Sequence, residues 1–216
     1  MEDDRGTPMS YDELIKLLKT AKSAEEIDKY KENIAELIPQ VRRMFDYDQK
    51  NHAHQFDLWM HCLHTVIGLE RGMDDDMLYL AALLHDIGKP DCQVRGSRPN
   101  DENMHYYGHP ERSAEIVQDE ILYTLYEKGV DLLFEDQMRL VYFVRHHDEH
   151  VSLRMKHIRG HLKRVSLDDF KKLMLLQVAD AKAHVMLPVI EKRVEICEKL
   201  SGSYADYLQE QILSGR

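Results

Sequence analysis

The pattern of apolar and polar positions is helical along almost the whole chain. Apolar residues recur at intervals of three and four after Ser10 and again after Ser23, and each serine is followed three residues later by a glutamate. A serine with a glutamate at that spacing is typical of the capping box that begins a helix. We therefore predict two amphipathic helices at the start of the chain, the second of which ends near Pro39.

Further helices are predicted downstream of a polar stretch at 46–55. We place them at about 57–70, 75–88, 110–128, 134–147, 166–184 and 188–212. Residues 90–108 lack periodicity and are rich in loop formers, so we expect a long loop of the kind that is often functional. Strand-like alternation is absent. The pattern predicts an all-α protein, in which a helical arm at 1–45 packs on a core of residues 46–216 that includes the C-terminal helix.

Composition and charge narrow the class of protein. Of 216 residues, 43% are hydrophobic, 10 are Gly and 6 are Pro, which excludes a wholly disordered or collagen-like chain. The net charge of −10 opposes general binding to duplex nucleic acid. The acidic start has no apolar signal segment, no apolar run reaches 18 residues, and the cysteines show no CxxC spacing. We expect a cytoplasmic protein with free thiols and no membrane partner.

The 13 histidines are the unusual feature of the composition. His61 lies among apolar residues of one predicted helix, and Asp180 shares the inner face of another. His85 and Asp86 follow directly on the apolar run 78–84. A buried carboxylate without a partner is unfavourable by several kcal/mol, and a bound cation removes that penalty. A donor set of nitrogen and oxygen atoms suits Mn, Fe, Co, Ni, Zn or Mg.

Three more histidines could extend this site to a second ion. His109 precedes a proline at the start of a predicted helix, and His146 and His147 close another. A single histidine on a helix is more often a packing or surface residue than a ligand. An ordered set spread over separate helices is a stronger signal, and with two of these three it offers about six ligands. We therefore expect one or two divalent ions per chain, bridged in the second case by a shared aspartate.

The segments that carry these residues are similar to the motifs of a known superfamily. They read Asp57-Leu-Trp-Met-His61, Ala82-Leu-Leu-His-Asp-Ile-Gly-Lys-Pro90, Gly108-His109-Pro-Glu-Arg-Ser-Ala, Val144-Arg-His-His147 and Val178-Ala-Asp180. From about 51 to 183 the chain resembles the HD-domain superfamily of metal-dependent phosphohydrolases, which are helical bundles. The spacing of the first two motifs resembles the HD domain attached to bacterial tRNA nucleotidyltransferases. The part that transfers nucleotides has no counterpart among these residues, so we do not expect tRNA repair.

The resemblance assigns roles to the candidate residues. It implies that four residues bind the first ion: His61, His85, Asp86 and Asp180. His109 and either His146 or His147, of which we favour His147, would bind the second. Lys89 stands where the superfamily places a lysine that neutralises phosphate charge. Because no Gly-Tyr-Pro follows His147, the chain departs from the cyclic-di-GMP phosphodiesterases of the superfamily.

The chemistry implied is hydrolysis of a phosphate ester, by a phosphomonoesterase or a phosphodiesterase, with water as the nucleophile. We expect Asp86 and Lys89 to be catalytic, Asp86 by orienting or deprotonating the water and Lys89 by neutralising developing charge. The expected substrate is a small phosphorylated molecule such as a nucleotide. Because the protein is acidic, such a substrate needs local positive charge. We assign substrate binding to four basic residues: Lys89, Arg112, Arg154 and Lys156.

Supporting roles are expected for a few other residues. The basic stretch 154–164 forms a rim that attracts phosphate or, alternatively, a solvated helix face. Tyr106 or Tyr107 could stack on a base. His64, one turn from His61, is the best candidate for a residue that supports a ligand. The apolar faces of the terminal helices could pair in a homodimer.

Two other functions are compatible with the same residues. Some proteins with this ligand order hold two irons and activate dioxygen, and iron-dependent oxygen consumption would identify such an oxygenase. A non-catalytic nucleotide-sensing module would instead bind nucleotide tightly without turnover. The presence of Lys89 beside a full ligand set favours the hydrolase.

Overall fold

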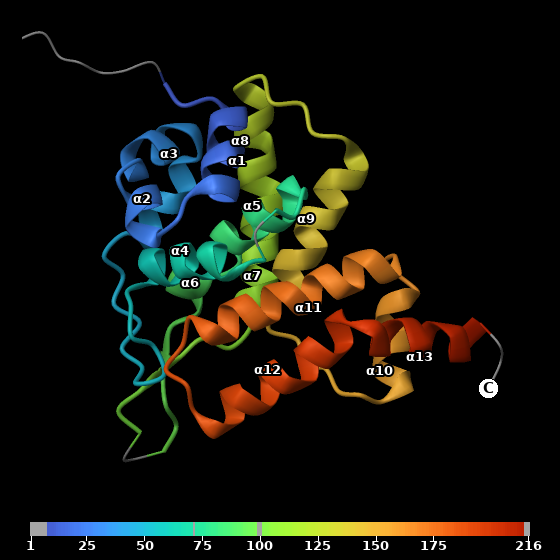
Figure 1. Ribbon diagram of the computed structural model, residues 1–216. Coiled ribbons are helices and arrows are strands. Elements are labelled where there is room, and N and C mark those ends of the chain that lie inside the picture. Colours follow the sequence, from blue (N-terminus) through green and yellow to red (C-terminus); the bar gives the residue numbers. More distant parts are fainter. Residues whose placement is uncertain (1–7, 71, 99–100, 214–216) are drawn as a thin grey trace, which may run out of the picture.

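A computed structural model describes residues 8–70, 72–98 and 101–213 of the chain. The predicted all-α class is confirmed, since these residues form helices and one short hairpin (Figure 1). The α-helices are α1 (Tyr11–Thr20), α2 (Ala24–Asp28), α3 (Lys31–Leu37), α4 (Leu58–Gly68), α5 (Asp76–Leu84), α6 (Lys89–Cys92), α7 (His109–Ile116), α8 (Leu122–Glu127), α9 (Phe134–His146), α10 (Met155–Leu162), α11 (Leu167–Lys182), α12 (Pro188–Ser201) and α13 (Ser203–Leu213). The remaining elements are a 3-10 helix η1 (Pro39–Met44), a π-helical stretch η2 (Val117–Ile121) and strands β1 (Val94–Arg95) and β2 (Met104–His105).

The first predicted helix begins with the expected capping box. The Ser10 hydroxyl accepts a hydrogen bond from the backbone N–H of Glu13 at 3.3 Å, and the Glu13 carboxylate accepts one from the Ser10 N–H at 2.8 Å. The second predicted helix is interrupted, because α2 ends at Asp28 and α3 begins at Lys31. α1 packs on α5 and α2 packs on α4, so residues 11–44 share one continuous core with the helices that follow (Figure 1).

Helix α5 is the centre of this core. All residues from Met77 to Leu84 are buried, because α1, α4, α9 and α11 surround the helix. This explains why its sequence is a continuous apolar run rather than an amphipathic stripe. α4 packs against both α5 and α11, and α9 packs against both α5 and α7. The residues that follow α5, beginning with His85, are buried as well.

A glycine allows the chain after α5 to approach α7 closely. A Cβ atom at Gly88 would lie 2.5 Å from the backbone nitrogen of Ser113, which is closer than real Cβ contacts come. The Gly88 N–H also donates a hydrogen bond to the Ser113 hydroxyl at 2.9 Å. This contact fixes the turn that carries Asp86 against the helix that begins with His109.

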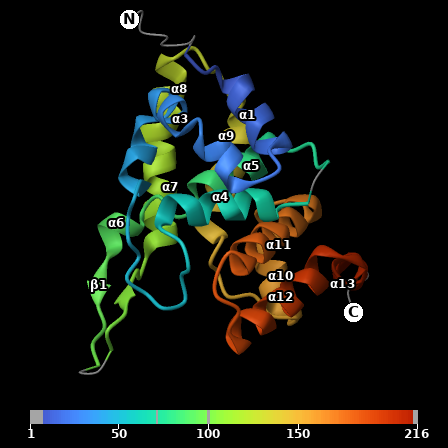
Figure 2. The same ribbon diagram turned by 60° about the vertical axis from the view of Figure 1, so that its left-hand side comes forward.

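Three regions differ from the sequence-based expectation. The long loop at 90–108 contains the antiparallel hairpin of β1 and β2, whose two-residue strands are too short to show an alternating pattern; Figure 2 shows it extending away from the helices. The basic stretch at 154–164 forms α10, anchored by the buried Ile158. The predicted helix at 188–212 is broken at Gly202, whose extended backbone separates α12 from α13. Within the described residues, no helix combines the length and apolarity needed to cross a membrane.

Candidate metal centre

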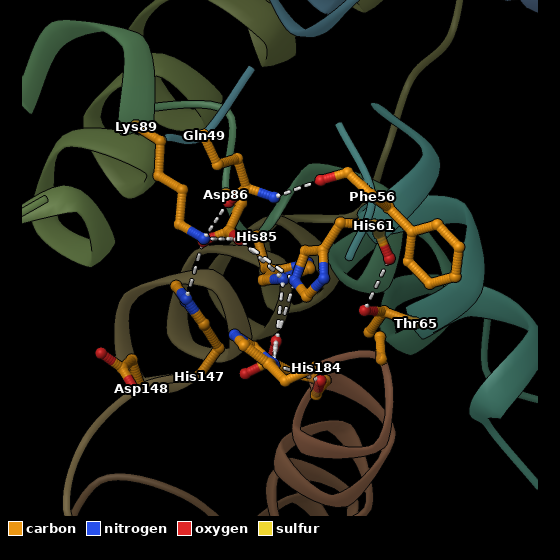
Figure 3. A network of polar contacts seen from close by, with 12 residues as sticks. Gln49, Phe56, His61, Thr65, His85, Asp86, Lys89, His147, Asp148 and His184 are labelled. Atoms are coloured by element: carbon orange, nitrogen blue, oxygen red, sulfur yellow. Dashed lines mark hydrogen bonds and ion pairs between the residues drawn. The ribbon is translucent and has the colours of Figure 1, made fainter. Parts of the chain in front are cut away.

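Four buried side chains from three helical segments meet at the end of α5. His61 lies near the start of α4, His85 and Asp86 follow α5, and Asp180 comes from the last turn of α11. The Nε2 atom of His61 lies 3.1 Å from Asp180 Oδ1 and 3.3 Å from Asp86 Oδ2. The Nε2 atom of His85 lies 3.3 Å from Asp86 Oδ2 and 3.5 Å from Asp180 Oδ1. These four side chains, which the resemblance assigned to the first ion, are brought together. Figure 3 shows three of them, His61, His85 and Asp86.

A second group of ligand atoms gathers on the other oxygen of Asp86. His109 is the first residue of α7, and His147 follows the end of α9. Their Nε2 atoms lie 3.1 Å and 3.3 Å from Asp86 Oδ1. Asp86 therefore presents Oδ2 to one set of imidazoles and Oδ1 to the other, as a carboxylate that bridges two ions would.

The hydrogen-bond network fixes the tautomers of three of these histidines. The Nδ1 atoms of His85, His109 and His147 each lie 2.7–2.9 Å from a backbone carbonyl oxygen three residues earlier. A carbonyl only accepts, so each Nδ1 carries the hydrogen and, in the neutral ring, Nε2 keeps its lone pair. Those lone pairs point toward Asp86 (Figure 3 shows His85 and His147).

This arrangement leaves electron pairs facing one another unless a cation lies between them. The Nε2 atoms of His109 and His147 are 3.2 Å apart. Within the described residues, His85 Nε2 and Asp86 Oδ1 are buried and have no hydrogen-bond partner. Burial lowers the pKa of His85, but the carboxylates of Asp86 and Asp180 hold it well above its usual value, so a positive charge is favoured at its Nε2. A divalent ion would take the place of that proton and would also satisfy Asp86 Oδ1. The residues present therefore fit one or two divalent ions, with the mixed nitrogen and oxygen donors that Mn, Fe, Co, Ni or Zn accept.

Lys89 is a buried cation beside this centre. Its Nζ lies 2.7 Å from Asp86 Oδ2 and donates a hydrogen bond to the side-chain carbonyl of Gln49 at 2.8 Å (Figure 3). Burial alone raises the pKa of Asp86, but the charge of Lys89 and the nearby imidazoles outweigh it and hold that pKa well below its usual value. Burial lowers the pKa of Lys89, and the charge of Asp86 more than reverses this. Both groups are therefore charged at neutral pH.

Two further histidines lie against the first group. His184 follows α11, and its Nδ1 lies 2.8 Å from the carbonyl oxygen of Asp180. The rings of His54 and His184 each contact the ring of His61. Burial lowers the pKa of His54 to about 2 and also lowers that of His184, so both are neutral. His64, the expected supporting residue, stacks on Phe56 instead and is half-buried on α4.

Arg193 is a residue of the centre that sequence reasoning missed. It extends from α12, and its Nη2 donates a hydrogen bond to the His147 carbonyl oxygen at 2.7 Å. Its Nη1 lies 2.7 Å from Asp148 Oδ1, and Nη2 lies 3.9 Å from Asp180 Oδ2. The residue belongs to an ordinary amphipathic helix with no motif around it, so its local sequence gave no signal.

Several predicted site residues are not brought to the centre. His146 is hydrogen-bonded to Glu149 and belongs to neither ligand group, because successive residues at the end of α9 point in different directions. Arg112 forms ion pairs with carboxylates of α6 and α7, including Asp91 at 2.7 Å. Arg154 and Lys156 are exposed at the start of α10. These three basic residues do not line the cavity at the centre, so their positions do not support the expected role in substrate binding.

A cavity of about 730 Å³ opens onto both ligand groups. Asp86, Lys89, His109 and Asp180 line its inner part. Residues of the 90–108 loop, among them His105 and Tyr107, line another part. The volume is within the range of small-molecule sites in enzymes.

Comparison with known proteins places these observations in a family. The family model described as the HD domain matches residues 58–184, more than half of the chain and the segment that supplies every residue of the two ligand groups. Two curated proteins, each described as a multifunctional CCA protein, are similar over 85 residues, or 39% of this chain. The protein from Nitrosococcus oceani is 31% identical and that from Thioalkalivibrio sulfidiphilus is 32% identical.

The chain spans about a fifth of the length of these relatives, at 20% and 19%. The family match covers the helices that carry His61, Asp86 and Asp180, and the buried cluster of histidine and aspartate residues could hold a metal. The chain therefore belongs to the HD domain family, within the superfamily of metal-dependent phosphohydrolases.

Proposed function

We propose that the chain hydrolyses a phosphate ester of a small phosphorylated molecule, with a nucleotide as the favoured class, and uses one or two divalent ions to do so. The observation that carries this proposal is the position of Asp86. Its two oxygens face separate groups of imidazole nitrogens, and a buried lysine lies beside one of them. Charge of both signs is thus concentrated at one end of a cavity, as hydrolysis of a phosphate ester requires.

The geometry supports an assignment of the residues that would hold the ions. His61, His85, Asp86 and Asp180 would hold one ion, and Asp86 with His109 and His147 would hold a second. A divalent ion at such a place supplies a Lewis acid that lowers the pKa of water toward neutrality and draws electron density from a phosphoryl oxygen.

The chain's own groups would complete the catalysis. Asp86 is ionised, so a carboxylate oxygen can accept a hydrogen bond from the attacking water and orient it. Lys89 uses one N–H for Asp86 and one for Gln49, which leaves a third donor for a phosphoryl oxygen. Because both groups are buried, the interaction of Lys89 with charge that develops on the phosphoryl group is only weakly screened.

An exposed aromatic ring supports the choice of a nucleotide. Tyr107 lines the cavity, is 75% exposed and stacks on His105 with an angle of 3° between the ring planes. The face of Tyr107 that is turned away from His105 is available to a planar base. Tyr106 is buried and its hydroxyl donates to the Gln49 carbonyl, so of the two tyrosines Tyr107 is the one that could stack on a base.

A metal-supplemented screen tests this function. Purified chain is incubated anaerobically with Mn²⁺, Co²⁺ or Mg²⁺ and a panel of nucleotides, sugar phosphates and p-nitrophenyl phosphate, with and without a chelator. We expect release of phosphate or of a nucleoside monophosphate that the chelator abolishes. The anaerobic condition separates this reaction from that of an iron-dependent oxygenase, which would need dioxygen.

Two variants make the screen specific. Asp86→Asn should lose activity by more than about 10²-fold, because the carboxylate that joins the two ligand groups is removed. Asp119→Asn, at an exposed carboxylate of η2, is the matched control and should be fully active. Absence of product from metal-loaded wild-type chain across the panel, or equal activity of the two variants, would contradict the proposal.

A further inference from the structure

Two arginines line the cavity and form no ion pair with a carboxylate in the part of the chain that the structure describes. Arg145 lies in the last turn of α9 and is half-buried, and Arg164 follows α10 and is exposed. Neither guanidinium forms an ion pair or a hydrogen bond with any of the described residues. The other two cations of the cavity wall are held in place, Lys89 by Asp86 and Arg193 by Asp148.

The carboxylates on the same wall do not neutralise these arginines by contact. Asp148 is paired with Arg193, and Glu149 is hydrogen-bonded to His146. Glu111 is exposed and forms no ion pair with a residue that the structure describes. The guanidinium groups of Arg145 and Arg164 therefore keep their donors for something that enters the cavity.

The chemistry of these donors points to an anion. A guanidinium has five N–H groups in a planar fork that matches two oxygens of a phosphate, and such charge-assisted hydrogen bonds are stronger than neutral ones. The phosphate that reacts would already be served by Lys89 and by the ions that Asp86 and its neighbours would hold. Two more cations in the same cavity exceed what a substrate with one phosphate requires.

We propose, on the basis of the function proposed above, that Arg145 and Arg164 bind a second phosphate group of the substrate, one that is not hydrolysed. The preferred substrates then carry at least two phosphate groups, as a nucleoside bisphosphate or polyphosphate does. This assignment takes the place of the expected contacts of Arg154 and Lys156, whose side chains lie outside the cavity. Of the basic stretch 154–164, Arg164 is the basic residue that reaches the cavity wall.

The test compares two double variants that remove the same charge. R145Q/R164Q changes the two cavity arginines, and R154Q/K156Q changes two exposed cations outside the cavity. Each variant and the wild type are assayed with p-nitrophenyl phosphate, which has one phosphate, and with adenosine 3′,5′-bisphosphate, which has two. Circular dichroism and thermal unfolding establish that each variant folds.

We expect R145Q/R164Q to lose about 10² in kcat/KM toward the bisphosphate, mainly through KM, at about tenfold for each arginine. Its activity toward p-nitrophenyl phosphate should stay within about threefold, and R154Q/K156Q should resemble the wild type with both compounds. An equal loss with both substrates, or no loss with the bisphosphate, would overturn the assignment.

A binding measurement separates this inference from the proposed function. If the wild type hydrolyses neither compound, calorimetry with Mn²⁺ and adenosine 3′,5′-bisphosphate still reports the subsite. R145Q/R164Q should then raise the dissociation constant about 10²-fold, whereas R154Q/K156Q should leave it unchanged. If the wild type does not bind the bisphosphate, or if the two double variants bind it with equal affinity, the phosphate subsite is refuted. If the bisphosphate binds through the two arginines but is not hydrolysed, only the proposed hydrolase activity is refuted.

Discussion

The Nε2 atoms of His109 and His147 lie 3.2 Å apart and both face Oδ1 of Asp86. Each ring donates its Nδ1 hydrogen to a backbone carbonyl, so two lone pairs and a carboxylate oxygen converge on one point. Three acceptors without a donor between them are the arrangement that a cation relieves. This relationship supports a second metal site at the second ligand group more strongly than the sequence alone does.

The number of ions can therefore be tested at this pair. Replacing His109 and His147 together by alanine should lower the metal content of the purified chain from about two ions to about one, because the second group loses two of its three ligands. Metal content is measured by inductively coupled plasma mass spectrometry after dialysis against Mn²⁺ or Zn²⁺. The exposed His150→Ala variant is the control and should keep the wild-type content. Unchanged metal content in the double variant would show that His109 and His147 hold no second ion.

The sequence predicted most of this centre because each ligand stands at a local landmark. His61 interrupts an apolar helix, the pair at 85–86 ends one, and His109 stands beside a proline at a helix start. A helical pattern and an approximate boundary were enough to place them on inner faces. The resemblance favoured His147 over His146, and the structure separates the two residues by the way α9 is rotated against α7.

Contacts between distant segments could not be predicted in this way. Arg112 has the charge and the neighbourhood of a substrate ligand, but the packing of α6 on α7 places Asp91 beside it. Arg193 and Arg145 are ordinary surface-type residues in the sequence, and the arrangement of α12 and α9 brings them to the cavity. What the sequence lacked was the orientation of the helices relative to one another.

Lys89 offers a test that separates catalysis from metal binding. Lys89→Ala should lower kcat about 10²-fold, because one donor that stabilises developing negative charge is lost. Its metal content should not fall, since removing a cation 2.7 Å from Asp86 leaves the carboxylate more available to an ion. Lys156→Ala is the control at an exposed lysine. A normal rate in Lys89→Ala would show that the lysine is structural.

A substitution at Gly88 tests whether stability and activity depend on the close packing of α7 against the turn that carries Asp86. Gly88→Ala places a Cβ 2.5 Å from the Ser113 nitrogen, so the turn must move and the free energy of unfolding should fall by about 2 kcal/mol. Because that turn carries Asp86, phosphate release should fall as well. In Gly160→Ala the added Cβ meets nothing within 4 Å, and a helical alanine should be neutral or stabilising. Urea unfolding of both variants measures the difference, and equal stability would contradict the close approach.

A pH dependence is expected at Asp75, away from the metal centre. Its carboxylate caps α5, contacts Arg139, and lies 2.8 Å from Lys172 Nζ. Burial raises the pKa of Asp75, but these two cations outweigh burial and lower it below its usual value. Because its pKa is lower in the folded state, ionised Asp75 stabilises the folded protein fully at pH values above the unfolded-state pKa, near 3.9. This stabilisation is lost as the pH falls through the lower folded-state pKa.

Asp75→Asn should therefore lose about 2 kcal/mol of unfolding free energy at pH 7 and progressively less below about pH 4. The comparison is made by urea unfolding at several pH values. Asp168→Asn, at a carboxylate that is 71% exposed, should change stability by less than about 0.5 kcal/mol throughout. A difference between wild type and Asp75→Asn that grows on acidification would contradict the assigned sign.

Arg193 links α12 to both ligand groups, and its two effects on a bound ion oppose each other. Its guanidinium donates a hydrogen bond of 2.7 Å to the His147 carbonyl oxygen and so orients His147 as a ligand. Its positive charge lies 3.9 Å from Asp180 Oδ2 and so disfavours a bound cation. Arg193→Lys keeps the charge and cannot reproduce the fork that joins His147 to Asp148. It should therefore bind metal about tenfold more weakly than the wild type. Arg193→Met also removes the charge, so its affinity should lie between the two.

Competition with a chromophoric chelator gives the metal affinities, and Arg159→Lys at an exposed position of α10 is the matched control. If Arg193→Lys and Arg159→Lys bind metal with equal affinity, Arg193 does not orient His147. Weaker binding by Arg193→Met than by Arg193→Lys would show that the guanidinium charge supports the centre rather than opposing the ion. The family match ends at residue 184, before α12 begins. The expected order of metal affinities among the Arg193 variants would therefore assign to α12 a positioning role outside the matched segment.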